Sequence, residues 1–244
     1  MVQTQVYYLS RNPLYEKKKP YTLEFLVDPE DEKNGMRKTN VIVIKRSLAI
    51  QEIESPNDFK LSDDGFYVLK EETELDVAEA LMNREGVEAA YSRQLEIIPT
   101  KHFPEKRDER FPTTTDEPIT VIHEQPARLA HSDYSAPGAI LQLKSSFPGQ
   151  ERYFEGRDFD MNVWGPLVGP NDDWPLTVCD YMSLDAENDT VAADRVHRDQ
   201  VGENQLFFSG GTTSRGNSPR TFWCSETPTL LAHARVSTFH TPIS

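Results

Sequence analysis

The sequence predicts a mostly β protein, and two observations support that prediction. Its 244 residues include 17 prolines and 12 glycines, which indicates many strand ends and irregular connections rather than a helical bundle. Short β-branched runs are bounded by turn residues, as in segment 38–47 and in the run 66–69 that follows an Asp-Asp-Gly turn. A chain of this length forms one large domain or two small ones, and all-β barrels of this size are often single domains.

Residues 1–37 are expected to form an extended N-terminal arm. Two alternating runs within the arm could each pair as a strand, namely residues 6–10 and 22–27. The pattern changes over 75–98, where apolar residues recur among helix formers and predict one or two helices interrupted near Gly86. The proline-rich and charged stretch 99–118 is expected to be a lid or a connection across the surface.

The remaining predicted elements lie in a domain expected over 38–206. The strands expected there are 119–123, 126–135, 159–167 and 174–183, and a short helix is expected over 139–146. Residues 207–244 keep neither a strand nor a helix period and are rich in Ser and Thr. On composition, this atypical tail is expected to be loop or poorly ordered chain.

The charge balance disfavours several classes of partner. Forty acidic and 26 basic residues give a formal net charge of −14, which opposes binding to the phosphates of nucleic acids. No apolar run approaches the length of a membrane span, and the N-terminus lacks the apolar core of a secretory signal. The 2 cysteines make no disulfide framework, so a cytoplasmic location is expected. Cys179 is interpreted as an inert core thiol.

A His-x-Asp pattern, His131 and Asp133, lies on or just after the strand predicted over 126–135. Positions two apart share one face of a strand, so the two side chains can take adjacent corners of a metal octahedron. A distant histidine, His240 or less readily His233, would complete the facial triad of non-haem Fe(II) sites. The pattern also occurs by chance, and the alternative is a strand-end histidine hydrogen-bonded to a local acid.

Two later segments combine tryptophans with an isolated polar residue. One interpretation is that the two segments form the wall of a pocket. Trp164 and Trp174 would then supply apolar surface, and Asn162 and Asp180 would supply polar contacts. The alternative interpretation is that these are core tryptophans that flank tight turns.

Three blocks in this order resemble the asaB-type hydroxylase/desaturase family, which is related to gibberellin desaturase and to the cephem-methoxylation proteins. The blocks are residues 38–69, ARLAHSDYSAPGA at 127–139 and MNVWGPLVGPNDDWPLTVCD at 161–180. The resemblance covers roughly residues 38–206. It implies a double-stranded β-helix, or jelly roll, with flanking helices. It also implies Fe(II) held by two histidines and an aspartate, with 2-oxoglutarate and O₂ as co-substrates.

By this resemblance, His131 and Asp133 are the first two iron ligands, and no catalytic residue is assigned beyond the ligands. The implied activity is hydroxylation or desaturation of a small molecule in secondary metabolism. The alternative is a truncated, inactive relative that acts at most as a binding or interaction protein. One departure is Gly165, which stands where the family usually has an arginine.

The tail also departs from the family, which continues past Gly-Glu-Asn with a Trp-Tyr-Tyr strand, a distal histidine and a downstream arginine. With permitted choices at degenerate bases, a shifted frame rereads 211–244 as WYYLERQLP and DVLVFRNTDS, followed by GPRARFHFPHSNF. That string holds the missing elements in order, and its distal histidine spans the codons of His240 and Thr241. We therefore expect a frame shift that begins between Gln205 and Gly211, and incomplete C-terminal strands.

Overall fold

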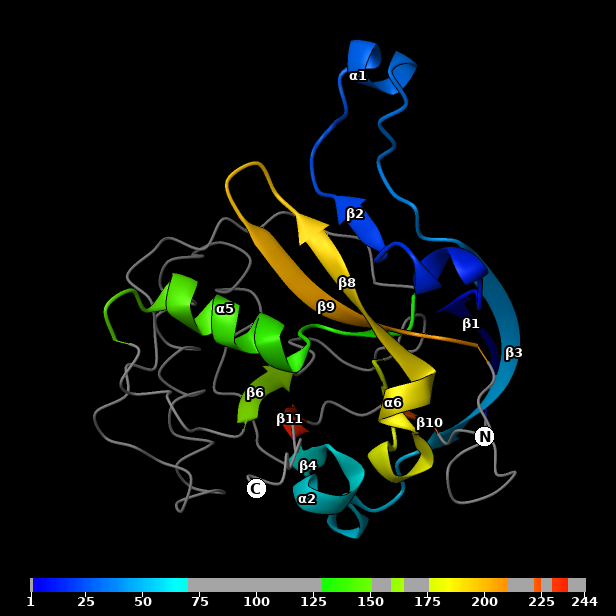
Figure 1. The fold of residues 1–244 in the computed structure, drawn as a ribbon. Coiled ribbons are helices and arrows are strands. Elements are labelled where there is room, and N and C mark those ends of the chain that lie inside the picture. Colours follow the sequence, from blue (N-terminus) through cyan, green and yellow to red (C-terminus); the bar gives the residue numbers. More distant parts are fainter. Residues whose placement is uncertain are drawn as a thin grey trace, which may run out of the picture.

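The computed structural model describes residues 2–69, 129–150, 159–164, 176–209, 222–224 and 230–236. Strands dominate these ranges and form three sheets (Figure 1). The helical elements described are α1 (Pro29–Lys33), α2 (Leu61–Asp64), α5 (Ala136–Ser146), α6 (Ala186–Asp189), η1 (Pro13–Glu16), η2 (Pro56–Asp58) and η5 (Tyr181–Ser183). None of the described helices has the length and hydrophobicity required to cross a bilayer.

The first sheet has the order β1-β3-β10-β7. Its members are β1 (Val2–Leu9), β3 (Val43–Glu52), β10 (Phe222–Cys224) and β7 (Thr177–Cys179). β1 pairs antiparallel with β3 along its whole length, with Val2 opposite Ile50 and Leu9 opposite Val43. The N-terminal strand is therefore an integral part of the fold, and most of the run 6–10 that was expected to pair as a strand lies within it.

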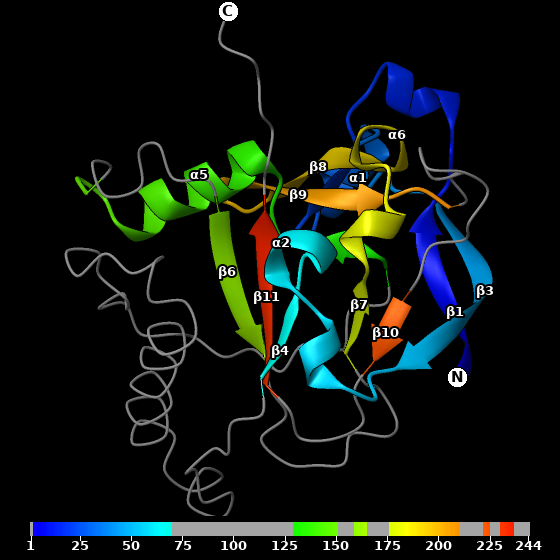
Figure 2. The same ribbon diagram turned by 90° about the horizontal axis from the view of Figure 1, so that it is seen from below.

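The second sheet has the order β4-β11-β6, and the third has the order β2-β8-β9-β5. Their members are β4 (Tyr67–Leu69), β11 (Leu230–Val236) and β6 (Phe159–Trp164), then β2 (Tyr21–Leu23), β8 (Thr190–Val196), β9 (Val201–Phe207) and β5 (His131–Ser132). Figure 2 shows β4, β11 and β6 beside the first sheet, with α5 and the β8–β9 hairpin drawn across one end of both.

β1 also joins the first sheet to the third. Tyr7 forms a parallel bridge with Leu129, and Leu9 forms one with Phe208. Leu9 is completely buried, and it packs with Ala193 and Leu206 in one core cluster. A second cluster joins Tyr8 and Ile50 of the first sheet to Phe207 of β9. A third contains Phe59 and Phe66 with Val68 of β4 and Val178 of β7. The first two clusters thus lie where the first and third sheets meet, next to the strand that carries His131.

Several expected elements are present with shifted bounds. The helix expected over 139–146 begins earlier, because Ser135 caps it and a proline occupies its first turn. In the tail, β10 and β11 are strands, although composition predicted no regular structure there. The expected helices over 75–98, the connection 99–118 and the strand 119–123 lie outside the described residues.

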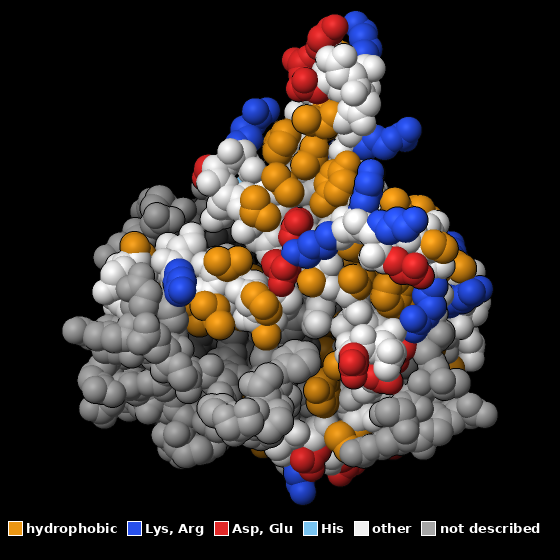
Figure 3. Space-filling view, in the orientation of Figure 1, with side chains coloured by type: hydrophobic (Ala, Val, Ile, Leu, Met, Phe, Trp, Pro, Cys, Tyr) orange, Lys and Arg blue, Asp and Glu red, His pale blue; other side chains and the backbone are white. Residues whose placement is uncertain are grey.

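The segment between β2 and β3 projects from the body and carries α1 (Figure 1). Asp28 caps α1 by accepting a hydrogen bond from the backbone N–H of Glu30 at 2.8 Å. Figure 3 shows hydrophobic side chains gathered below the tip of this projection. The large apolar side chains exposed along it include Leu26 and Met36.

Candidate metal centre

His131 and Asp133 come together at the end of β5. The strand pairs antiparallel with β9, which places His131 opposite Leu206 and Ser132 opposite Gln205. Asp133 follows directly in a bend. Nε2 of His131 lies 3.3 Å from Oδ1 of Asp133, and the Asp133 side chain is 56% exposed, which leaves the pair accessible.

The orientation of the imidazole is set by the backbone. Nδ1 of His131 lies 2.7 Å from the carbonyl oxygen of Leu129, and a carbonyl can only accept. Nδ1 therefore carries a proton and donates it. In a neutral ring, Nε2 would then direct a lone pair at the Asp133 carboxylate. Two acceptors at this separation repel each other unless a cation lies between them.

A proton is one cation that satisfies the pair. The hydrogen bond with Asp133 raises the pKa of His131 above its usual range, against the opposing effects of burial and of the nearby positive charge of Arg195. A divalent metal is the other cation. Ligand distances close to 2 Å place neighbouring octahedral donors about 3 Å apart, near the observed separation. An imidazole whose second nitrogen donates to a backbone carbonyl is also the usual arrangement in metal sites.

The face of the sheet that carries His131 holds an unsatisfied polar atom. Antiparallel partners share a face, so Leu206 lies on the face of His131, and Asn204 lies two positions further along the same face. Oδ1 of Asn204 is buried and has no hydrogen-bond partner among the residues that the structure describes. Its opposite residue on β8 is Ala193, which is buried. Ala193 and Leu206 pack with Leu9 in a core cluster, so this acceptor lies in an apolar setting inside the fold.

A third donor beside His131 and Asp133 is not found among the described side chains. The described residues contain no group of three or more His, Cys, Asp or Glu side chains placed to hold a metal. His240 lies outside the described residues, and His233 lies on β11 opposite Asn162 of β6. The structure therefore describes two donors of the expected three.

The expected pocket residues are described to different extents. Trp164 lies on β6 opposite Leu231, and Trp174 lies outside the described residues. Asp180 accepts a hydrogen bond from the backbone N–H of Met182 at 2.8 Å and caps η5. Burial raises the pKa of Asp180, and the nearby Asp64 carboxylate adds to that shift. A contribution of these residues to a substrate pocket stays a prediction.

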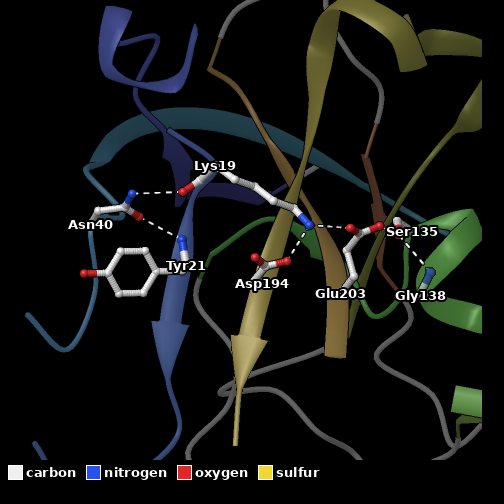
Figure 4. Close-up of polar contacts among 7 residues, drawn as sticks. All are labelled: Lys19, Tyr21, Asn40, Ser135, Gly138, Asp194 and Glu203. Carbon is white, nitrogen blue, oxygen red and sulfur yellow. Dashed lines mark hydrogen bonds and ion pairs between the residues drawn. The ribbon is translucent and has the colours of Figure 1, made fainter. Parts of the chain in front are cut away.

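A chain of polar contacts links the N-terminal arm to the turn that carries Asp133 (Figure 4). Lys19 is ion-paired with both Asp194 of β8 and Glu203 of β9. The hydroxyl of Ser135 donates to the carboxylate of Glu203 and accepts from the backbone N–H of Gly138 at 3.0 Å. The network therefore continues from the arm through the β8–β9 hairpin to the first turn of α5.

The charges in this network stabilise one another. Burial alone would raise the pKa of Glu203, but hydrogen bonds from Lys19 and Ser135 outweigh it and lower that pKa. Burial alone would lower the pKa of Lys19, but the two carboxylates outweigh it and raise that pKa. Sequence reasoning missed these residues. A serine just before Ala-Pro-Gly is a helix-start signal that could have identified Ser135, whereas nothing in the sequence connects Lys19 with Glu203.

Comparison with protein families gives one match that covers most of the chain. A model described as "YDMC: Oxidoreductase/YMDC permease-like domain" matches residues 6–211. The match ends where the composition of the chain changes.

Two fungal relatives match shorter segments. The Fe(II)/2-oxoglutarate-dependent dioxygenase nvfI of Aspergillus novofumigatus is 37% identical over 78 residues, which are 31% of this chain and 25% of that protein. The aspirochlorine biosynthesis protein N of Aspergillus oryzae is 31% identical over 87 residues, which are 35% of this chain and 34% of that protein. The chain therefore matches a quarter to a third of the length of these relatives.

Solved structures resemble nearly the whole chain. The iron and alpha-ketoglutarate-dependent endoperoxidase NvfI superposes with a TM-score of 0.71 at 15% identity, over 96% of this chain and 83% of that one. A variant of the same endoperoxidase superposes with a TM-score of 0.74 at 16% identity, over 96% of this chain and 82% of that one. The likeness confirms the predicted jelly-roll fold class, although the three described sheets do not close into a barrel.

Proposed function

We propose a reaction for this chain, which belongs to the YDMC family of oxidoreductase/YMDC permease-like domains. In the proposed reaction, the protein hydroxylates or desaturates a small-molecule substrate with non-haem Fe(II), 2-oxoglutarate and O₂. The names of the two fungal relatives support this proposal, since one is an Fe(II)/2-oxoglutarate-dependent dioxygenase and the other belongs to a biosynthetic pathway. We further propose a secondary-metabolite substrate and a cytoplasmic location.

The observation that supports the proposal most directly is the 3.3 Å separation of Nε2 of His131 from Oδ1 of Asp133. The Leu129 carbonyl holds the imidazole in the tautomer that a metal requires. The buried side chains of Leu206 and Ala193 keep the neighbouring face apolar. When bound there, Fe(II) with 2-oxoglutarate supplies the oxidation of unactivated C–H bonds, and the protein supplies geometry and a dry surface. We propose His240 as the third ligand.

Anaerobic titration with Fe(II) in the presence of 2-oxoglutarate tests the proposal. The wild-type chain is expected to develop the weak visible charge-transfer band of an iron–keto acid chelate. The His131→Ala variant is expected to lose that band, because one of the two described donors is removed. Retention of the band in His131→Ala would remove His131 from the ligand set, and circular dichroism of both proteins controls for folding.

A second candidate function is supported by the tail. The family match ends at residue 211, and the described residues hold only two of the three expected donors. A chain without the third ligand would be an inactive relative that acts at most as a binding or interaction protein. A folded wild-type chain that develops no band with Fe(II) and 2-oxoglutarate would favour this candidate.

A further inference from the structure

We propose that Glu203 is a positioning residue for the metal pair. Its carboxylate holds the turn that carries Asp133, and Lys19 of the N-terminal arm holds that carboxylate. The inference rests on the proposed function. It adds to the site a residue of β9 and a residue of the arm, both distant in sequence from the His-x-Asp pattern.

Asp133 lies between two attachments to the same strand. Before it, Ser132 is paired with Gln205 in the ladder between β5 and β9. After it, the backbone N–H of Ser135 donates to the carbonyl oxygen of Glu203 at 3.1 Å. The Ser135 hydroxyl adds a second bond, to the Glu203 carboxylate. The short connection that bears Asp133 is therefore fixed at both of its ends to nearby residues of β9.

The start of α5 is fixed against the same residue. Ser135 is 3% exposed, and its single hydroxyl donates to Glu203 while accepting the N–H of Gly138. A Cβ atom on residue 138 would overlap the carbonyl oxygen of Glu203, so the first turn of α5 packs directly on β9. Displacement of the Glu203 side chain would leave the buried Ser135 hydroxyl without this acceptor and would remove one attachment of the Asp133 turn.

Lys19 supplies the countercharge that a partly buried carboxylate requires. The Glu203 side chain is only 18% exposed, and Lys19 is its ion-pair partner (Figure 4). Asp194 shares the same lysine from the neighbouring strand. In the contacts described, the Asp194 carboxylate reaches Lys19 and not the Asp133 turn, which makes Asp194 a matched control for Glu203.

The test compares Fe(II) affinity in the wild-type chain, Glu203→Ala and Asp194→Ala, by anaerobic titration in the presence of 2-oxoglutarate. Loss of a residue that orients a metal ligand weakens metal binding by roughly 10- to 100-fold. We expect Glu203→Ala to show a loss of that size with a shifted charge-transfer band, and Asp194→Ala to bind Fe(II) as the wild type does. Both variants lose one partner of Lys19, and Glu203→Ala also loses the bond to Ser135, so its melting temperature without metal should fall further than that of Asp194→Ala.

A second pair of variants keeps the Lys19–Glu203 ion pair intact. Ser135→Ala removes the hydroxyl and is expected to weaken Fe(II) binding, whereas Ser135→Thr retains a hydroxyl and is expected to restore it. If Glu203→Ala does not fold, the comparison of Ser135→Ala with Ser135→Thr tests the positioning role instead. Combining Ser135→Ala with Glu203→Ala should give no further loss, because both remove the same bond.

Two results would contradict the inference, and they differ in what they overturn. Wild-type affinity in Glu203→Ala, or equal losses in Glu203→Ala and Asp194→Ala, would overturn the positioning role while the proposed function stands. Absence of the band in the folded wild-type chain would instead overturn the proposed function, and this inference with it.

Discussion

Gly138 and Glu203 lie so close that a Cβ atom on residue 138 would overlap the carbonyl oxygen of Glu203. Gly138→Ala must displace α5 from β9, so we expect the free energy of unfolding to fall by about 1–3 kcal/mol. Urea denaturation followed by circular dichroism measures this. Gly202→Ala is the control, because a Cβ there would meet its nearest neighbours only at 3.9 Å. Equal losses in the two variants would contradict the close packing.

Arg11 is expected to stabilise the fold through a buried carboxylate. Its guanidinium lies 3.1 Å from Oδ1 of Asp189, whose side chain is 1% exposed, and 4.8 Å from the ring centroid of Phe208. Arg11→Ala leaves a buried carboxylate without its countercharge. Since Arg11 itself is 47% exposed, we expect a loss of about 1–3 kcal/mol rather than the larger cost of a fully buried pair.

Thermal and urea unfolding of Arg11→Ala test that expectation. Lys33→Ala removes an ion pair of similar length, 3.1 Å to Glu30, at an exposed site on α1. Exposed pairs contribute little, so the melting temperature of Lys33→Ala should match that of the wild type. A wild-type melting temperature in Arg11→Ala as well would show that Asp189 is satisfied by its other contacts.

The lowered pKa of Glu203 predicts how the free energy of unfolding changes in acid. Its pKa is lowered in the folded chain, so its contribution is present above the ordinary value of 4.5 and is lost as the pH falls through the lowered folded value. The wild type should therefore be more stable than Glu203→Gln at neutral pH, and the difference should shrink as the solution is acidified below that ordinary value. Urea midpoints across this range measure it, and a difference that stays constant on acidification would contradict the prediction.

Asn204→Leu is expected to stabilise the metal-free protein, as measured by its thermal unfolding. Oδ1 of Asn204 is buried and has no hydrogen-bond partner in the described part of the chain, and a buried acceptor without a donor costs about 1–3 kcal/mol. Leucine of similar shape removes that cost, so the metal-free protein should unfold at higher temperature. Lower stability in Asn204→Leu would mean that the amide makes a stabilising contact.

The reading frame of the tail can be settled from the gene. The shift is expected to begin between Gln205 and Gly211, and the family match stops at residue 211. The nucleotides beyond the codon for Asn204 should therefore encode, in a shifted frame, the Trp-Tyr-Tyr strand and the distal histidine. If no frame there encodes them, the frame-shift hypothesis is wrong.

Local patterns in the sequence predicted several elements well. The strand expected over 6–10 lies largely in β1, the run 66–69 contains β4, and the helix expected over 139–146 is the main part of α5. The strand expected over 38–47 is present as β3 but shifted to later residues. In each case, β-branched alternation or a capping signal was present within a short window.

The β8–β9 hairpin, by contrast, was not predicted. β9 begins Val-Gly-Glu-Asn-Gln, which gives no apolar alternation. Its polar residues are accommodated by contacts with distant segments, such as that of Glu203 with Lys19. The proximity of His131 and Asp133 could be predicted because they are two positions apart, although Asp133 lies in the bend just after β5 and not on the strand itself. The network that supports the pair could not, because its members meet only in the folded chain.

The bridge between Leu9 and Phe208 sets the order in which this protein can be completed during synthesis. β1 leaves the ribosome before β3, and the two strands can pair as soon as β3 has been translated. Its other edge must wait until residues 129 and 208 have been translated. Throughout that interval a nascent strand exposes unpaired backbone groups and Leu9, which predicts slow maturation and dependence on chaperones.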